Sequence, residues 1–406
     1  MPYPQFVRSF VPALSPAPSV PDFYPEAPAA GPRPVWDIFC AVVDNYGDVA
    51  VCWRLARQLA AEYPIAPRLW VDEPAAARRL IPALDPKLPR QTIDGVEIRR
   101  WEADFPAVEP GEMVIAAFAC SVPDSFLQAM ARQSPPPLWI NLEYLSAEEW
   151  VADCHRLPSP HPRLPLTQYF YFPGIDARTG GLLRERDYDA RRAEFSVEAF
   201  RAGLGLPERE DGELLVSLFA YENPGVADLL SAWEKGDTPV ICLVPEGRVM
   251  PQVAATFGVS DLRVGDRMSR GALAVQVLPF VEQSRYDELL WASDLNFVRG
   301  EDSFVRAQWA ERPFVWQIYP QQEQAHMAKL EAFMTHYREG LPLQTAEALA
   351  GLWRAWNSAG EVAAAWPAFR AALPALAAHG QLWSDHLQAA GGLAAGLVQF
   401  RKDALK

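Results

Sequence analysis

Residues 295–313 read LNFVRGEDSFVRAQWAERP, and this stretch decides the fold that the sequence predicts. Its apolar start predicts a short strand, its glycine a turn, and its final proline the end of the intervening helix. We expect Asp302 or Ser303 to cap that helix. The corner either serves only to cap the helix in this way, or it also binds an anion. The second role is available because the first N–H groups of a helix have no helical partner. Arg299 and the Ser303 hydroxyl are suited to donate to phosphate oxygens.

A second corner, at residues 43–48, reads VDNYGD and carries the carboxylates Asp44 and Asp48. Asp48 as a helix cap and Asp44 as a strand-end acceptor are ordinary structural roles. If these roles do not account for them, two carboxylates at one strand end form an acidic site that would bind a metal ion, an amine or a guanidinium. The motif has no Asp-x-Asp arrangement and no adjacent histidine, so an organic cation is favoured over a metal. One anion corner and one acidic corner together predict a two-domain enzyme with a cleft between its halves.

The bulk composition excludes several classes of protein. The 406 residues include 37 Lys and Arg and 51 Asp and Glu, a formal charge of −14 without a sustained basic run, which argues against a nucleic-acid partner. Five widely spaced cysteines without a Cys-x-x-Cys pair predict reduced thiols in a cytoplasmic protein, and the histidines form no zinc motif. No apolar run approaches the ~18 residues that a membrane span needs, and the N-terminal residues do not form a convincing secretory signal.

The order of the predicted elements favours two doubly wound α/β halves. Residues 1–34 hold ten prolines and are expected to form an extended arm. A strand at 36–43 and a helix at 49–62 should open the first half, and the proline- and aromatic-rich residues 158–173 should link it to the second. Residues 346–399, rich in Ala and Leu, predict a helical tail. The other predicted strands are Arg68–Asp72, Met113–Phe118, Leu138–Leu142, Leu214–Ala220, Val240–Val244, Ala274–Leu278, Leu295–Val298 and Phe314–Tyr319.

Aromatic and amide side chains follow two of the predicted strands in the second half. Any single aromatic residue is most simply explained by core packing. These residues lie just past strand ends, however, where a base could be held between rings while an amide hydrogen-bonds its edge. The set comprises Phe219, Tyr221, Phe280, Gln283 and Tyr286.

Three motifs in combination resemble the EarP family of protein-arginine rhamnosyltransferases, which act on translation elongation factor P. They are residues 42–48, residues 299–309, and Pro313–His326, a strand that breaks at Pro320 into a glutamine-rich helix start. The resemblance extends from about residue 35 to the C-terminus. The proline-rich arm departs from the family pattern, and it is an extension of unknown role or a misassigned start.

The resemblance implies the GT-B class of α/β fold, with two Rossmann-like domains facing each other across a cleft. Residues 35–183 would bind the acceptor, completed by a C-terminal helix at 388–406, and residues 184–387 would bind the nucleotide sugar. The family also implies transfer of L-rhamnose from TDP-β-L-rhamnose to an arginine of elongation factor P, with inversion and without a metal or other cofactor.

The residue roles implied by the resemblance divide between the two corners. Asp48 resembles the proposed general base and Asp44 the partner that holds the acceptor. Glu301 resembles an essential glutamate of the donor loop, with Asp302 and Ser303 beside the diphosphate. The positions that would hold the thymine nucleoside are those of the aromatic and amide set, Phe219, Tyr221, Phe280, Gln283 and Tyr286.

Two alternatives stay open from the residues alone. A GT-B transferase could use another nucleotide sugar or a small acceptor. A regulatory protein could bind a nucleotide sugar without turnover, but such a protein has no need of acidic residues such as Asp48 and Glu301 near the reacting sugar.

Overall fold

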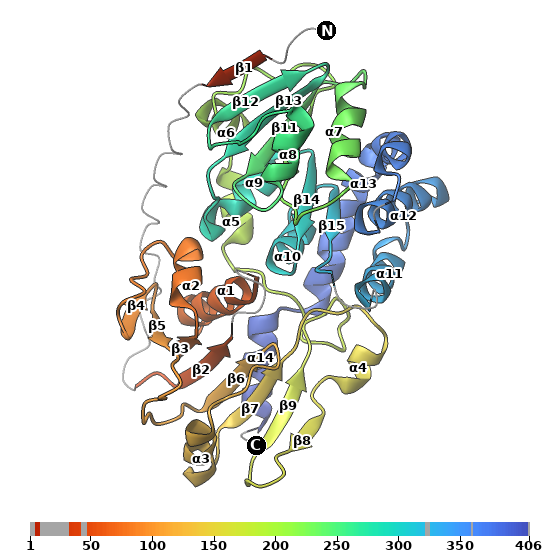
Figure 1. Ribbon diagram of the computed structural model, residues 1–406. Helices are drawn as coiled ribbons and strands as arrows, with labels where there is room; N and C mark the ends of the chain where they lie inside the picture. Colours follow the sequence, from red (N-terminus) through yellow and green to blue (C-terminus); the bar gives the residue numbers. More distant parts are fainter. Residues whose placement is uncertain (1–4, 9–31, 42–46, 321–324, 359, 405–406) are drawn as a thin grey trace. The chain divides into compact units, whose positions relative to one another are not determined.

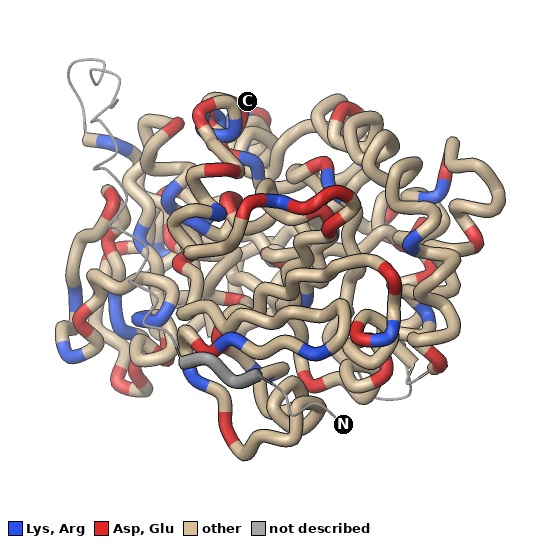
Figure 2. The backbone as a smooth tube through the Cα atoms, turned by 90° about the horizontal axis from the view of Figure 1, so that it is seen from above, with Lys and Arg blue, Asp and Glu red and all other residues tan. Residues whose placement is uncertain are grey.

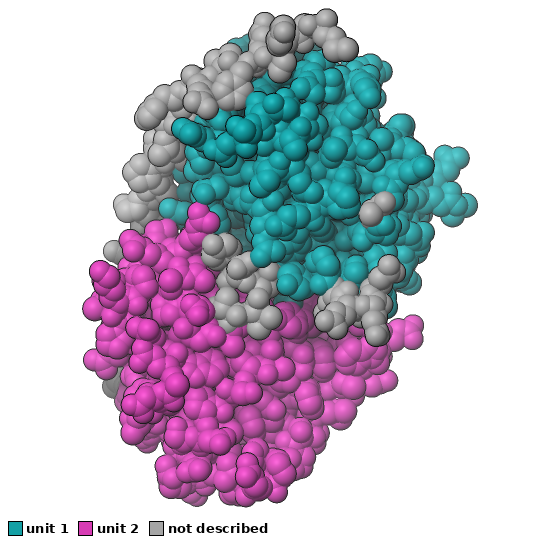
Figure 3. All heavy atoms as spheres, in the orientation of Figure 1, with its two compact units in different colours: residues 1–19, 187–385 teal, residues 20–186, 386–406 magenta. Residues whose placement is uncertain are grey.

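The computed structural model describes residues 5–8, 32–41, 47–320, 325–358 and 360–404. Contacts between Cα atoms divide the chain into two compact units (Figure 3). Unit 1 comprises residues 1–19 and 187–385, and unit 2 comprises residues 20–186 and 386–406. Lys and Arg residues are interspersed with Asp and Glu along the described chain (Figure 2).

Unit 2 contains a largely parallel sheet in the order β4-β5-β3-β2-β6-β7-β9-β8, with β4 and β8 antiparallel at its edges (Figure 1). From β5 to β9 this is the doubly wound order 3-2-1-4-5-6 of a Rossmann sheet. The strands are β2 Val35–Cys40, β3 Ala66–Val71, β4 Arg90–Ile93, β5 Val96–Arg100, β6 Met113–Ala117, β7 Leu138–Leu142, β8 Pro158–Pro160 and β9 Thr167–Tyr171. The helices are α1 Gly47–Glu62, α2 Pro74–Leu80, α3 Asp124–Arg132, α4 Trp150–Cys154 and α14 Leu393–Ala404.

Both faces of this sheet are buried, which explains why its central strands are apolar at most positions. Ile38 of β2 packs in one core with Leu55 of α1 and Leu397 of α14. Its neighbour Phe39 points to the other face, where it joins a second core with Phe126 of α3. The period of two along a strand therefore assigns successive residues of β2 to two different layers of helices.

One carboxylate is buried within the second core. Asp37 of β2 is 0% exposed and is paired with Arg68 of β3, and it accepts hydrogen bonds from Trp70 Nε1 at 2.7 Å and from the Gly111 N–H at 2.8 Å. These contacts join β2, β3 and the segment before β6, so this charge fixes the register of three neighbouring segments.

Unit 1 contains the sheet β1-β12-β13-β11-β10-β14-β15. The strands from β13 to β15 are parallel and follow the order 3-2-1-4-5, while β12 and then β1 add antiparallel strands at one edge. The strands are β1 Gln5–Arg8, β10 Leu214–Leu218, β11 Val240–Pro245, β12 Asp266–Arg270, β13 Leu273–Leu278, β14 Leu295–Arg299 and β15 Phe314–Gln317. The helices are α5 Tyr188–Glu194, α6 Val197–Gly203, α7 Val226–Glu234, α8 Met250–Phe257, η1 Gln283–Arg285, α9 Tyr286–Ala292, α10 Asp302–Trp309, α11 Ala325–Tyr337, α12 Leu343–Asn357 and α13 Val362–Ala390.

Most predicted strands are confirmed, and β7 has the predicted bounds. The interpretation of residues 158–173 as a linker is wrong, because they form β8 and β9 at the edge of the unit 2 sheet. Prolines are tolerated there because β8 is the outermost strand and needs ladder hydrogen bonds on one side only. The predicted strand at 36–43 ends at Cys40, and residues 42–46 lie outside the described part of the chain. Sequence reasoning missed β1, β4, β5 and β12, while the helical tail is confirmed by α12, α13 and α14.

We predict that Asp37→Ala destabilises unit 2 strongly, because Arg68 would remain buried without its partner. The expected loss is about 3–5 kcal/mol, the usual effect of breaking a buried pair. Urea unfolding followed by tryptophan fluorescence measures it. Glu102→Ala is the matched control, since the Arg100–Glu102 pair is about half exposed and its loss should change stability by about 1 kcal/mol or less. Equal effects of the two substitutions would contradict the structural role assigned to Asp37.

Candidate functional site

The candidate site of unit 1 lies where the order of its strands reverses. β10 lies between β11, which follows it in the chain, and β14, which comes later. Ligands of doubly wound sheets bind outside the carboxyl ends of the strands at such a switch point. The loop after β10 carries Phe219 and Tyr221, and the loop after β14 carries Gly300 and Glu301. The topology therefore brings two of the predicted motifs to one place.

The corner between β14 and α10 differs in detail from the predicted cap. The helix begins at Asp302, and Glu301 occupies the N-cap position without a side-chain capping hydrogen bond. The Ser303 hydroxyl accepts from the Arg299 N–H at 3.0 Å and donates to the Arg299 carbonyl at 2.5 Å, so it closes the turn instead of capping the helix. Gly300 has a φ of 62°, the left-handed conformation that favours glycine. The prediction that Asp302 or Ser303 caps the helix is wrong, because the helix already begins at Asp302 and both residues lie within it.

Arg299 connects the two loops at the switch point. Its guanidinium carbon lies 4.5 Å from the ring centroid of Phe219 and 4.6 Å from that of Tyr221. Rings on these positions hold the guanidinium over their faces, where their quadrupoles attract a cation. The turn before α10 thus combines a fixed positive charge with the N-terminal end of a helix, an arrangement suited to an anion.

The predicted aromatic residues gather at this edge of the sheet, although two of them are also part of the core. Tyr221 and Tyr286 are buried, whereas Phe219 and Phe280 are half-buried. The rings of Phe219 and Tyr286 lie 5.6 Å apart, and Tyr221 is held through its N–H by the Gln317 side chain at 2.8 Å. Burial raises the pKa of the Tyr286 hydroxyl, an effect that its contact with Ser303 partly opposes. The Tyr286 side chain is therefore an uncharged part of the lining of this site.

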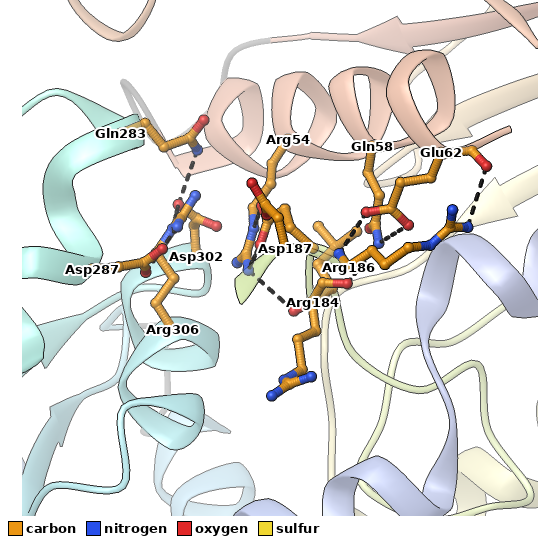
Figure 4. Close-up of polar contacts among 12 residues, drawn as sticks. Arg54, Gln58, Glu62, Arg184, Arg186, Asp187, Gln283, Asp287, Asp302 and Arg306 are labelled. Atoms are coloured by element: carbon orange, nitrogen blue, oxygen red, sulfur yellow. Dashed lines mark hydrogen bonds and ion pairs between the residues drawn. The ribbon is translucent and has the colours of Figure 1, made fainter. Parts of the chain in front are cut away.

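Gln283 is buried within a polar network of unit 1. Its amide Nε2 donates to Asp302 Oδ2 at 2.9 Å, and Arg306 Nε donates to the same oxygen at 3.1 Å (Figure 4). Asp302, at the corner between β14 and α10, and Gln283, in the β13–α9 connection, are thus in direct contact. Both residues belong to the predicted nucleotide site, and the structure adds that they contact each other.

The candidate site of unit 2 centres on Asp48 in the first turn of α1. Its side chain is 2% exposed, and Tyr144 donates its hydroxyl hydrogen to Asp48 Oδ1 at 3.0 Å. Asp44 lies outside the described residues. Tyr144 was missed by sequence reasoning, although it comes two residues after the end of β7 and so at the carboxyl edge of the sheet, where such a signal could have been sought.

Tyr144 is in turn positioned by a strained turn after β6. Its ring stacks on Phe118 with 4.4 Å between centroids. Phe118 and Ala119 have φ angles of 57° and 55°, which are left-handed conformations that non-glycine residues adopt at an energetic cost. The turn, the stacked rings and the hydroxyl form one support for the Asp48 carboxylate.

A second set of contacts fixes α1 itself. Arg54, Gln58 and Glu62 follow one another at intervals of four along the helix and point toward residues 183–186 (Figure 4). Arg54 is paired with both carboxylate oxygens of Glu185, at 2.6 and 2.8 Å, and Gln58 donates to the Arg184 carbonyl at 2.6 Å. Glu185 therefore supplies the counter-charge that the buried Arg54 requires.

Within the described residues, no group of three or more His, Cys, Asp or Glu side chains is placed to hold a metal ion. Of the helices in those residues, none is both long and apolar enough to cross a membrane.

Comparison with known proteins decides the family. Residues 36–402 match the family model described as Elongation-Factor P (EF-P) rhamnosyltransferase EarP. The chain belongs to the EarP family. The match covers both units, and it includes the corner at Asp48 and the corner at residues 299–303.

Relatives in the EarP family have similar lengths. A protein-arginine rhamnosyltransferase of Pseudomonas putida is 51% identical over 378 residues, which cover 92% of this chain and 100% of that protein. One of Pseudomonas aeruginosa is 52% identical over 373 residues, covering 91% and 99%. A solved structure described as the structural basis for EarP-mediated arginine glycosylation of translation elongation factor EF-P has 38% identity and a TM-score of 0.64, covering 91% of this chain and 99% of that one. The predicted GT-B class, with two Rossmann-like sheets, is confirmed.

We predict that inorganic pyrophosphate binds the corner at Arg299 and raises the melting temperature of unit 1. Arg299→Met should weaken this binding about tenfold or more, because hydrogen bonds to a charged group are worth roughly 1.5–3 kcal/mol. Thermal shift titration measures the effect, with Arg285→Met as the control, since Arg285 is already paired with Glu288 at 2.7 Å. If both variants respond to pyrophosphate like the wild type, the anion site is not at this corner.

Proposed function

We propose that this protein transfers L-rhamnose from TDP-β-L-rhamnose to an arginine side chain of translation elongation factor P. The transfer inverts the anomeric carbon, needs no metal ion, and takes place in the cytoplasm. The observation that carries the proposal is the similarity, over nearly their whole length, to relatives named protein-arginine rhamnosyltransferase. The family description, which names elongation factor P, supports the acceptor.

The chemistry of the acceptor agrees with the Asp48 corner. An arginine guanidinium is protonated and its lone pairs are delocalised, so it needs a base that removes a proton as the new bond forms. Asp48, held by Tyr144, is the proposed base. Asp44 is its proposed partner in gripping the guanidinium through paired hydrogen bonds. The terminal nitrogen then attacks C1 of the sugar, its proton passes to Asp48, and the bond between C1 and the phosphate oxygen breaks.

The chemistry of the donor agrees with the corner of unit 1. The departing TDP carries off the bonding electron pair, and Arg299 with the first N–H groups of α10 would stabilise its charge. Glu301 is proposed as the essential carboxylate of the donor loop. The main chain at Asp302 and Ser303 is proposed to lie beside the diphosphate, since the Ser303 hydroxyl is engaged with Arg299. The proposed nucleoside-binding residues are Phe219, Tyr221, Phe280, Gln283 and Tyr286.

The deciding experiment measures the intact mass of elongation factor P after incubation with this protein and TDP-β-L-rhamnose. We expect a gain of one deoxyhexose and none when the acceptor arginine is replaced by lysine. TDP-glucose and UDP-glucose, tested in parallel, address the use of another nucleotide sugar. An unchanged mass with every donor would refute the proposed activity.

Asp48→Asn should abolish transfer while leaving TDP affinity nearly unchanged, because it removes the proposed base and alters none of the proposed nucleotide-binding residues. Tyr144→Phe keeps the Asp48 carboxylate and the ring stack on Phe118 but removes the hydroxyl that donates to Asp48, so transfer should slow by roughly tenfold. Mass-spectrometric rates and calorimetry with TDP separate the two effects. A fully active Asp48→Asn enzyme would rule out the assignment of Asp48 as base.

Activity should survive excess EDTA without loss of rate. Metal-dependent transferases neutralise their diphosphate leaving group with a divalent cation. Here the Arg299 guanidinium and the α10 N-terminus are proposed to do so. If chelation stops turnover and Mg²⁺ or Mn²⁺ restores it, Asp44 and Asp48 are better interpreted as metal ligands.

A further inference from the structure

A chain of buried charges lies behind Gln283 in unit 1 (Figure 4). Arg306 donates through Nε to Asp302 Oδ2 at 3.1 Å and through its terminal nitrogen to Asp287 Oδ1 at 2.9 Å. Asp287 also accepts from Arg191 at 3.1 Å. Arg306 is 3% exposed and Asp287 0% exposed, so these charges are almost fully removed from water. Removing charges from water costs desolvation free energy. Buried charges are therefore expected to be offset by paired charges and hydrogen bonds, or to serve a function.

The end of the chain is the amide of Gln283, which is 4% exposed. Asp302 Oδ2 receives two donors, Gln283 Nε2 and Arg306 Nε. A carboxylate that faces a guanidinium is stabilised in its ionised form, and an ionised carboxylate only accepts hydrogen bonds. Asp302 therefore selects the nitrogen of the amide as its neighbour.

The orientation of the amide follows from this selection. With Nε2 directed at Asp302, the oxygen Oε1 points away from Asp302, as Figure 4 shows. A reversed amide would place two acceptors against each other in a buried environment, at the cost of an unsatisfied polar contact. Asp302 and Arg306 thus determine that the oxygen of the Gln283 amide, and not its nitrogen, faces away from Asp302.

We propose that the chain Asp287–Arg306–Asp302 sets the nucleobase specificity of the donor site by fixing the Gln283 amide with its oxygen toward the base. This inference rests on the proposed function, which assigns Gln283 to the base. An amide oxygen accepts from the N3–H of thymine or uracil. It is repelled by N3 of cytosine, which is an acceptor at the same ring position. Arg306 and Asp287 act through Asp302 and Gln283, so they are positioning residues.

The test compares two ligands that differ only at this edge of the base. Dissociation constants for dUDP and dCDP are measured by calorimetry for the wild type, Asp302→Leu and Arg306→Met. Leucine has no polar side-chain atom, so Gln283 Nε2 loses its acceptor and the amide can turn over. Arg306→Met removes the guanidinium that holds the same oxygen of Asp302 in place. TDP has the same N3–H as dUDP and should follow it.

The wild type should bind dUDP about tenfold more tightly than dCDP, the value expected for one buried hydrogen bond. In both variants this ratio should fall toward one, with dCDP gaining relative to dUDP. Arg201→Met is the matched control. It removes an equally buried pair of the same unit, Arg201 with Glu213 at 2.7 Å, and should lower the melting temperature while leaving the ratio unchanged.

Each outcome bears on the proposal. If Asp302→Leu folds and keeps the wild-type ratio, the proposal is wrong, even if Arg306→Met fails to fold. A loss of affinity for dUDP and dCDP by the same factor would also overturn it, since that result describes a purely structural or diphosphate role. A wild type that binds TDP but transfers no sugar would refute the proposed function while leaving the specificity ratios measurable.

Discussion

The parallel doubly wound order of the two sheets is the constraint on which both sites depend. In unit 1 it makes β10 and β14 neighbours although α7, β11, α8, β12, β13 and α9 separate them in the chain. The loops after these strands therefore meet at one edge, and Arg299 of one loop rests on Phe219 and Tyr221 of the other. In unit 2 the same order makes β2 and β6 neighbours, with β7 next to β6, and the segments that follow them supply Asp48, Phe118 and Tyr144.

Buried charge is the second organising element, and its uses differ. Asp37 serves the fold by joining β2, β3 and the segment before β6. Arg54 fixes the helix that carries Asp48. Arg306 donates to Asp302, the residue that is proposed to orient the Gln283 amide. In each case the charge is compensated by paired hydrogen bonds, as a buried ion requires.

The sequence predicted the elements that local chemistry determines. The apolar runs gave nearly all the central strands, and the glycine at 300 marked the turn onto α10. Residues 158–173 were misinterpreted because prolines suggest a linker unless the strand is known to be at an edge, and edge position is a property of the whole sheet. The contact of Tyr144 with Asp48 and that of Gln283 with Asp302 join residues far apart in the chain, so no local pattern signals either.

The turn at Phe118 and Ala119 has a consequence for how this protein balances stability against precision. Two successive side-chain-bearing residues in the left-handed region store conformational energy that a glycine would release. A glycine at 118 would also remove the ring on which Tyr144 stacks. Selection for a more stable unit 2 and selection for a fixed Asp48 carboxylate therefore pull this turn in opposite directions, and the residues present are those that keep the carboxylate in place.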